Sequence, residues 1–316
     1  MCSFKVLKKR HCSILVLLLC ILPLFSFSQN TTRWKRSRGE FIFGLGSTNF
    51  LGELGGANRI GTNGFRDLEY IATRPLLNLG YSYKVKKNQA VQFDVTYGWL
   101  YGADKLTKEI CRNNRNITFR TPLAEISGKY MYLFQRKREG HRYNLSGGGG
   151  RRIRGWRNME RSSYLFSGFA AFWFNPKGLY TDGSWHSLKP LSTEGQGLYA
   201  SREPYHRVQF AIPIGGGFKL KISDDWLAGL EFGIRKTFTD YIDDVSTSYP
   251  DNDYLKDMNG EMAAYFSDPS LGLVPGQTLT NQQRGDPGDR DAYMFMTVTI
   301  RYKIPYSKRF FGIPKF

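Results

Sequence analysis

The sequence predicts an all-β fold: an eight-stranded antiparallel transmembrane barrel of the outer-membrane type with long extracellular loops. Residues 91–101 alternate between an aromatic or apolar face and a face of polar side chains and glycine, interrupted only by Leu100. The full segment, 89–101, is longer than the roughly five or six residues of a soluble strand and suits a tilted strand crossing a bilayer, which needs about nine to eleven. Seven further segments alternate in the same way, and short turns alternate with long loops between them, as in outer-membrane barrels.

The first four segments each have one apolar face. They are residues 40–47, with Phe41, Phe43 and Leu45; 76–85, with Leu77, Leu79, Tyr81 and Tyr83; 89–101, with Phe93, Val95, Tyr97 and Trp99; and 119–134, with Ile126, Tyr130, Tyr132 and Phe134. Glycine, amide, hydroxyl and charged side chains occupy the other face. Residues 86–88 form a predicted tight turn between the second and third segments.

The last four segments follow the same rule. They are residues 164–175, rich in aromatic side chains; 207–222, with Val208, Phe210 and Ile214; 226–238, with Leu230, Phe232 and Ile234; and 292–303, with Met294, Met296, Val298 and Ile300. Pro213 predicts a bulge or an irregular rung, because proline cannot donate to a sheet. Residues 223–225 form the second tight turn, whereas the connection at 135–163 is long where the pattern expects a short one.

The N-terminus is typical of a secretory signal peptide. Four basic residues precede an apolar stretch at 14–25, and Ser26-Phe27-Ser28 resembles a cleavage site. The predicted organisation is a signal peptide at 1–28, a flexible lead-in at 29–39, the barrel at 40–303 and a basic periplasmic tail at 304–316. An uncleaved anchor and a lipoprotein acylated at Cys20 are the alternatives. After cleavage only Cys111 remains, so an intrachain disulfide is not expected.

The formal net charge is +18, and removal of the signal peptide lowers it to +14. An exported protein does not meet the genome, so nucleic acid is not expected as a partner. Outer-membrane lipid, a polyanionic glycan or an acidic protein suits this charge better.

The second face of the barrel segments carries charges, which would be unfavourable against lipid and are acceptable inside a barrel if they pair. The expected lumen charge network consists of Asp94, Glu125, Lys129, Glu231, Arg235 and Arg301. For Asp94 the expected partner is Lys129, Arg235 or Arg301. Eight strands leave room for side chains rather than for an open channel. A soluble barrel of the lipocalin type, with its apolar faces inward, is the alternative that these charges disfavour.

The connection at 135–163 is strongly basic and is expected on the periplasmic side. It is either a solubilising run of charge or a docking patch for an acidic periplasmic partner. The candidate patch consists of Arg136, Lys137, Arg138, Arg151, Arg152, Arg154 and Arg157.

No nucleophile elbow, phosphate-binding loop or metal-ligand spacing occurs, so catalytic, cofactor and metal residues are not predicted. His186 and His206, near the outer rim, are the weak candidates for a hydrolase. The acidic segment 239–291 contains Asp251, Asp253, Asp257 and Glu261, which could offer oxygen ligands to Ca²⁺, but the EF-hand spacing is missing. A solvated acidic loop is the favoured interpretation.

Four strings resemble a known family: NITFRTPLAEI at 116–126, FNPK at 174–177, LSTEGQG at 191–197 and RKTFTDYIDDVSTSY at 235–249. Together they resemble the PorG-like outer-membrane barrels of Bacteroidota, which are associated with type IX protein secretion. The basic connection at 135–163 is longer than expected for that family.

The resemblance implies a non-catalytic protein of the outer membrane that acts as an anchor or scaffold for periplasmic secretion-ring proteins or lipoproteins. A small transport or adhesion barrel without a role in secretion is the alternative. The family-like loop residues are Thr193, Glu194, Gly195, Asp240, Tyr241, Asp243 and Asp244.

Overall fold

The structure, a computed structural model, describes residues 37–52, 54, 70–107, 109–135, 161–288 and 290–304. The predicted signal peptide, most of the lead-in, the basic patch and nearly all of the C-terminal tail lie outside the described residues.

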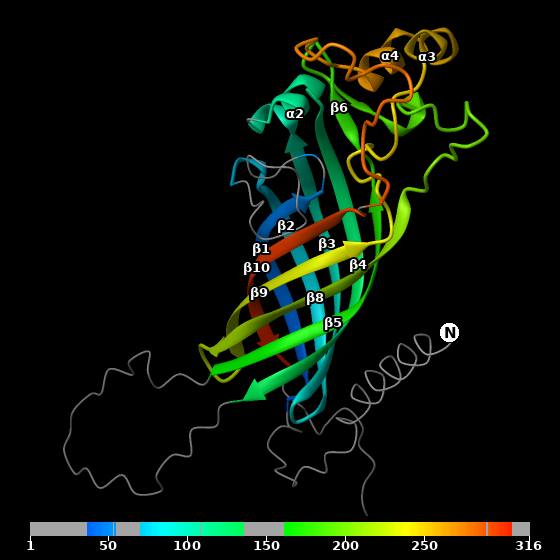
Figure 1. Ribbon diagram of the computed structural model, residues 1–316. Coiled ribbons are helices and arrows are strands. Elements are labelled where there is room, and N and C mark those ends of the chain that lie inside the picture. Colours follow the sequence, from blue (N-terminus) through cyan, green and yellow to red (C-terminus); the bar gives the residue numbers. More distant parts are fainter. Residues whose placement is uncertain are drawn as a thin grey trace, which may run out of the picture. The chain divides into compact units, whose positions relative to one another are not determined.

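Eight long antiparallel strands form a closed barrel (Figure 1). They are β1 Gly39–Leu51, β2 Arg74–Lys86, β3 Gln89–Ala103, β4 Thr118–Gln135, β5 Arg161–Phe174, β8 Val208–Lys221, β9 Trp226–Thr237 and β10 Ala292–Lys303. Each strand pairs with the next in chain order, and β1 pairs with β10, which closes the wall. The predicted fold class is therefore confirmed. β8 runs through Pro213 without a change of register, although its pairing with β5 is interrupted at Ile212 and Pro213.

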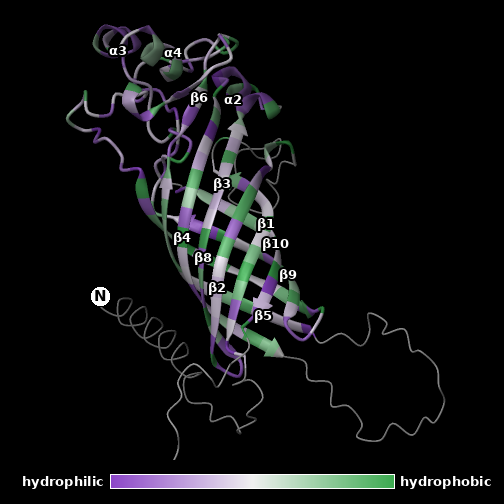
Figure 2. Cartoon of the chain, turned by 180° about the vertical axis from the view of Figure 1, so that it is seen from behind, coloured by the Kyte–Doolittle hydropathy of each residue, from purple (hydrophilic) through white to green (hydrophobic). Residues whose placement is uncertain are grey.

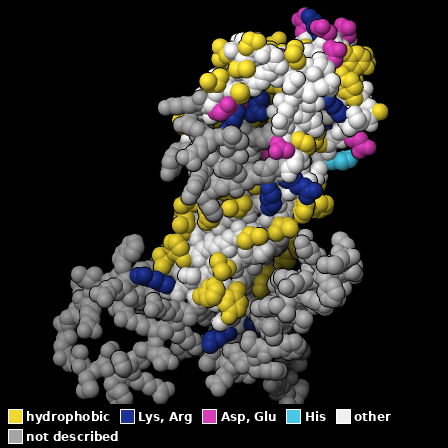
Figure 3. Space-filling model, in the orientation of Figure 1, with side chains coloured by type: hydrophobic (Ala, Val, Ile, Leu, Met, Phe, Trp, Pro, Cys, Tyr) yellow, Lys and Arg dark blue, Asp and Glu magenta, His cyan; other side chains and the backbone are white. Residues whose placement is uncertain are grey.

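The outer wall of the barrel is apolar. On β3, Phe93, Val95 and Tyr97 are exposed, whereas Asp94 and Thr96, which alternate with them, are buried. The same alternation runs around the barrel, and Figure 3 shows hydrophobic side chains spread over the wall. Such a surface is unfavourable in water and stable in contact with acyl chains. The wall is that of a membrane-spanning barrel, which excludes the soluble alternative. Among the described residues, no helix combines the length and apolar character needed to cross a bilayer.

The remaining elements cluster at one end of the barrel, which we call the loop end; the tight turns define the opposite turn end (Figure 1). They are η4 Tyr70–Ala72, η5 Asp104–Leu106, α2 Ile110–Arg115, β6 Lys177–Leu179, β7 Trp185–Ser187, η7 Lys189–Leu191, α3 Asn252–Asn259 and α4 Glu261–Ser267. We call this assembly the loop cap. The connection from β4 to β5 starts and finishes at the turn end.

The mouth of the barrel at the loop end is filled by an apolar cluster. Leu100, Phe119 and Phe172 come from the strands, and Ile242 and Val245 come from the segment that follows β9. All five are buried, so this segment packs into the mouth. Leu100 is the one apolar side chain among the polar inward positions of residues 91–101, and it belongs to this cluster.

Glycines on the inner face make room for long side chains. A Cβ atom at Gly217 would lie 2.6 Å from the Tyr164 hydroxyl oxygen, and one at Gly80 would collide with the Asp94 carboxylate. Glycine at these two inner-face positions thus leaves space for the large side chains that fill the lumen.

Candidate functional site

Two buried polar networks organise the molecule, one in the lumen and one in the loop cap. In the lumen, Lys129 on β4 lies between two carboxylates. Its Nζ is 2.8 Å from Asp94 Oδ2 on β3 and 2.5 Å from Glu231 Oε1 on β9. Because the strands that carry Lys129 and Glu231 lie far apart around the wall, this ion pair spans the lumen.

The network continues toward the turn end through Arg301 on β10. Its Nη2 is 3.3 Å from Glu231 Oε2, and its Nη1 donates to Gln92 Oε1 at 3.0 Å. Tyr164 donates to Glu231 Oε2 at 2.9 Å and accepts from Arg301 at 3.1 Å. The guanidinium therefore joins two neutral polar side chains to two carboxylates, that of Glu231 and, at 4.0 Å, that of Glu40.

Glu40 and Lys219 complete this part of the network, and the sequence prediction omitted both. Lys219 Nζ lies 2.9 Å from Glu40 Oε2, and Lys84 Nζ lies 2.9 Å from Glu40 Oε1. Glu40 on β1 and Lys219 on β8 both occupy inward positions of their strands. The alternation of side chains along each strand is therefore sufficient to predict that both residues face the lumen.

Glu125 and Arg235 form a separate pair nearer the loop end. Arg235 Nε is 3.4 Å from Glu125 Oε2, which also accepts a hydrogen bond of 2.7 Å from Tyr293. The Arg235 guanidinium lies 4.1 Å from the Phe295 ring centroid. All six residues of the predicted lumen network are therefore buried and face charged partners, and Asp94 pairs with Lys129.

The fully buried charges in the lumen are balanced, and the partly exposed Lys84 adds one further cation beside Glu40. Glu40, Asp94 and Glu231 face the buried cations Lys129, Lys219 and Arg301, and Glu125 faces Arg235. Removing one partner from such a set leaves a buried charge, which costs several kcal/mol, about 3–5. The packed network below the apolar cluster of the mouth makes the lumen a filled interior.

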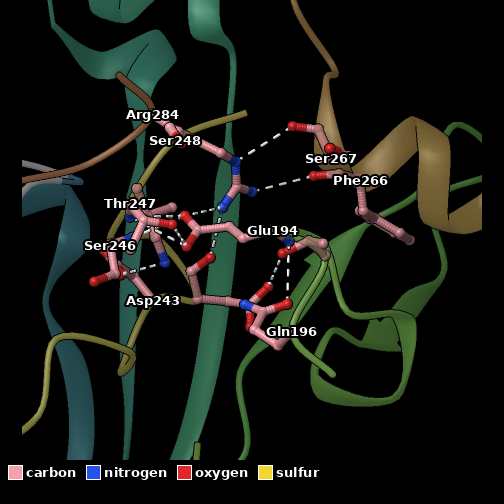
Figure 4. Close-up of polar contacts among 12 residues, drawn as sticks. Glu194, Gln196, Asp243, Ser246, Thr247, Ser248, Phe266, Ser267 and Arg284 are labelled. Carbon is pink, nitrogen blue, oxygen red and sulfur yellow. Dashed lines mark hydrogen bonds and ion pairs between the residues drawn. The ribbon is translucent and has the colours of Figure 1, made fainter. Parts of the chain in front are cut away.

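The loop cap brings most of the family-like residues together around Glu194 (Figure 4). The Glu194 carboxylate accepts from the backbone N–H groups of Ser246 at 2.9 Å and Thr247 at 3.1 Å, and from the Thr247 hydroxyl at 2.7 Å. Gly195, which follows, has a φ of 74°, a left-handed conformation that glycine adopts without strain. Glu194 thus fixes the path of residues 246–247.

Arg284 connects Glu194 to the rest of the cap. Its Nη1 is 2.9 Å from Glu194 Oε1 and donates to the Asp244 carbonyl at 2.7 Å. Its other nitrogens donate to the carbonyls of Ser267 at 3.3 Å and Phe266 at 3.2 Å, at the end of α4 (Figure 4). One buried guanidinium therefore joins three loop segments.

Asp244 has a φ of 66° and a buried carboxylate that accepts from Thr193 at 2.5 Å and from the Tyr205 hydroxyl at 2.7 Å. Burial raises the pKa of Asp244 to about 6, although Arg284 and the two hydroxyl donors oppose this rise. Burial, reinforced by Glu194, also raises the pKa of Tyr241 to about 12. The Tyr241 ring stacks on Tyr205 at 4.8 Å.

The other two family-like acids are also buried. Asp243 Oδ1 accepts from the Val245 N–H at 3.0 Å, and Asp240 lies at the start of the segment that packs into the mouth. Thr193, Glu194, Asp243 and Asp244 thus hold the loops over the barrel through carboxylate and hydroxyl hydrogen bonds.

The loop between β3 and β4 joins the same cap. Arg115 forms a two-point contact with Asp104, with distances of 2.8 and 3.0 Å, and donates to the Arg284 carbonyl at 2.7 Å. Asn114 donates to Gln277 at 2.7 Å and accepts from the Leu273 N–H at 2.6 Å. The loops after β3, β5 and β9 are therefore held together as one body.

The rim histidines do not form a catalytic triad in the described structure. Ser184 Oγ lies 2.6 Å from His186 Nε2 and donates to Asp182 Oδ1 at 2.5 Å. The carboxylate contacts the serine and not the histidine, so it does not orient the imidazole as a base. Asp182 also accepts from the Ser184 N–H at 2.8 Å, which is the pattern of a turn. His206 is exposed.

The acids considered as Ca²⁺ ligands have separate structural roles. Asp251 caps α3 by accepting from the N–H groups of Asp253 and Tyr254, and Glu261 pairs with Lys256 at 3.2 Å. Within the described ranges, no three metal-ligating side chains come together. The candidate basic patch between β4 and β5 lies outside the described residues.

A family model described as a domain of unknown function, DUF6089, matches residues 197–282, which include β8, β9, α3 and α4. No protein of curated function matches the chain.

Solved structures that resemble the chain include three surface barrels. Ail, the attachment invasion locus protein of Yersinia pestis, has 9% identity and a TM-score of 0.35, with 84% of this chain and 99% of that chain covered. Neisserial surface protein A has 8% identity and a TM-score of 0.35, with coverages of 84% and 96%. The outer membrane protein OprG from Pseudomonas aeruginosa has 9% identity and a TM-score of 0.34, with coverages of 86% and 98%. Similarity this distant says nothing about function.

Proposed function

We propose that the protein is an outer-membrane component of type IX protein secretion and acts as a non-catalytic anchor or scaffold for periplasmic secretion-ring proteins or lipoproteins. The observation that carries this proposal is the filled lumen. Residues 241–245 pack into the mouth, and paired charges occupy the interior below them, so the barrel acts through its surfaces. The family-like residues support the secretion assignment.

The turn end is the expected docking face. Its described residues include Lys86, Lys87, Arg161 and Lys221 against Asp224 and Asp225. A surface of this charge suits an acidic partner. The candidate patch at Arg136–Arg138 and Arg151–Arg157 belongs to the connection that starts and finishes at the same end.

Deleting the gene tests the role in secretion. The proposal expects type IX cargo to be retained inside the cell and secretion to return with the wild-type gene. A second test replaces Arg151, Arg152, Arg154 and Arg157 with Glu and expects loss of periplasmic partners in a pull-down. Lys105→Glu with Lys256→Glu, at the loop end, is the control and should recover partners normally.

A small adhesion or transport barrel is the second candidate, and the loop cap favours its adhesion form. Ile110, Leu271 and Leu273 are exposed by 67%, 52% and 62% on the water side of the barrel. The Leu271 N–H donates to the Asn114 carbonyl, so the two segments are adjacent. Exposed apolar groups of this kind mark interaction surfaces. Normal secretion of type IX cargo after gene deletion would favour this candidate.

A further inference from the structure

Three cations, Arg74 on β2, Arg120 on β4 and Lys177 on β6, lie near one another at the loop end of the barrel. Arg120 on β4 is the register partner of Tyr101 on β3, and Lys177 on β6 is the register partner of Arg120. On the other side, the Arg74 guanidinium lies 4.0 Å from the Tyr101 ring centroid. We call Arg74, Arg120 and Lys177 the basic row. Neighbouring strands lie about 4.8 Å apart, so these positions are close enough for one ligand to reach.

The basic row lies at the border of the apolar wall. Tyr101 belongs to the outward face of β3, whose next members toward the membrane are Trp99 and the exposed Tyr97. Tyr97 and Trp99 contact each other at 5.0 Å. Aromatic side chains of this kind mark the level at which acyl chains give way to headgroups. The loop ends of β3 and β4, with β6 beyond them, can be followed in Figure 2.

The cations of the basic row differ from those of the lumen in their partners. Among the described residues, no carboxylate pairs with Arg120 or Lys177, whereas Lys129, Lys219 and Arg301 all have acidic partners. Arg120 stacks 4.6 Å from the Trp185 ring centroid. Arg74 donates to the carbonyls of Ile71 and Thr73, each at 2.9 Å. Rings and carbonyls therefore hold the guanidinium groups of Arg74 and Arg120, and no carboxylate of the described residues neutralises Arg120 or Lys177.

We propose that the basic row binds the phosphate groups of a lipid headgroup in the leaflet at the loop end. A guanidinium presents paired N–H donors that match phosphate oxygens, and a lysine adds a point charge. The aromatic rings beside the cations cover the apolar part of the same molecule. A lipid fits better than a soluble phosphorylated compound, because the apolar wall begins directly beside the row. On the opposite side, shown in Figure 3, Lys and Arg also gather where the barrel meets the cap.

The test uses the full-length protein in nanodiscs and compares a bisphosphorylated disaccharide lipid with the same lipid lacking both phosphates. Bound lipid is counted by native mass spectrometry. Wild-type protein should retain the phosphorylated lipid preferentially. Arg120→Gln with Lys177→Gln should weaken this retention about 30-fold, equal to about 2 kcal/mol, since each cation near a charged lipid surface contributes about 1. Lys86→Gln with Lys87→Gln removes the same charge from the turn end and should leave retention of the phosphorylated lipid unchanged.

Equal retention of both lipids by the wild type would overturn the proposal, as would equal losses in the two double variants. Release of the lipid by millimolar inorganic phosphate would show a site for soluble anions and would also overturn it. The heat-dependent gel shift of the folded barrel checks that each variant folds. The proposal depends on the membrane placement of the barrel and not on secretion partners, so the two can fail independently.

Discussion

The lumen and the loop cap both bury charge, but they satisfy it with different groups. In the lumen, side chains from different strands neutralise one another, as Lys129 does with Asp94 and Glu231. In the cap, Glu194 accepts backbone N–H groups of residues 246–247, and Arg284 donates to three backbone carbonyls. The lumen network therefore holds strands of fixed conformation at fixed distances. The cap network determines the conformation of the loops themselves.

This difference predicts that substitutions in the lumen and in the cap will destabilise different parts of the molecule. A lumen charge connects strands on opposite sides of the wall, so its loss acts on the whole barrel. A cap charge connects loops that can open while the barrel stays closed, because loop segments can unfold locally.

The largest effect is expected for Lys129→Met. This change leaves Asp94 and Glu231 facing each other in a buried site without their shared cation. The free energy of unfolding should fall by about 3–5 kcal/mol, measured by urea unfolding in lipid vesicles. Lys86→Met, at the β2–β3 turn, is the control and should stay within about 0.5 kcal/mol of the wild type. A similar small change for both variants would show that the lumen network does not hold the barrel.

Arg284→Met should produce a local effect. The change removes donors from Glu194 and from the carbonyls of Asp244, Phe266 and Ser267, at a cost of about 3 kcal/mol within the cap. Limited proteolysis should cut residues 239–291 faster while the urea midpoint of the barrel is unchanged. The exposed Arg290→Met serves as the control. If the barrel midpoint fell as it does for Lys129→Met, the two networks would act as one.

The smallest effect is expected from pH, through Asp244. Burial raises the pKa of its carboxyl from 3.8 to about 6 in the folded cap. The folded state thus keeps a proton that the unfolded loop loses, so this contribution is complete below about pH 4 and is lost as the pH rises through 6. Cap stability should fall by about 1.4 kcal/mol between pH 5 and pH 7. Protease protection at the two pH values measures it.

Asp244→Asn removes the titrating group and should remove this pH dependence. Arg284, Glu194, Thr193 and Tyr205 face the carboxyl and remain in the variant. If the pH dependence of cap stability persists in Asp244→Asn, a group other than Asp244 causes it.

The lumen was predictable because a strand places alternate side chains on opposite faces. The positions of Asp94, Lys129, Glu231 and Arg301 follow from periodicity alone. Sequence cannot say which charges meet, because that depends on the register around a closed barrel. Asp94 illustrates this limit: three cations were candidates, and the geometry selects Lys129.

The loop cap was not predictable in the same way. Glu194 and Thr247 are separated by more than fifty residues, and the Glu194 carboxylate accepts from the backbone N–H of Thr247. Almost every residue type has a backbone N–H, so the sequence does not show which residue donates. Arg284 lies in the acidic segment 239–291, and nothing in that segment predicts that it is buried and joins three segments. The family-like strings contain Glu194 and Asp244 but do not indicate that their two loops converge.

A filled lumen is tested most directly by recording ion current across a planar bilayer that contains the purified full-length protein. Paired charges beneath an apolar mouth predict no steady single-channel current, with the folded barrel confirmed by its gel shift in the same sample. A steady open-channel current from the wild type would contradict the filled lumen, and with it the inference that the protein acts through its surfaces.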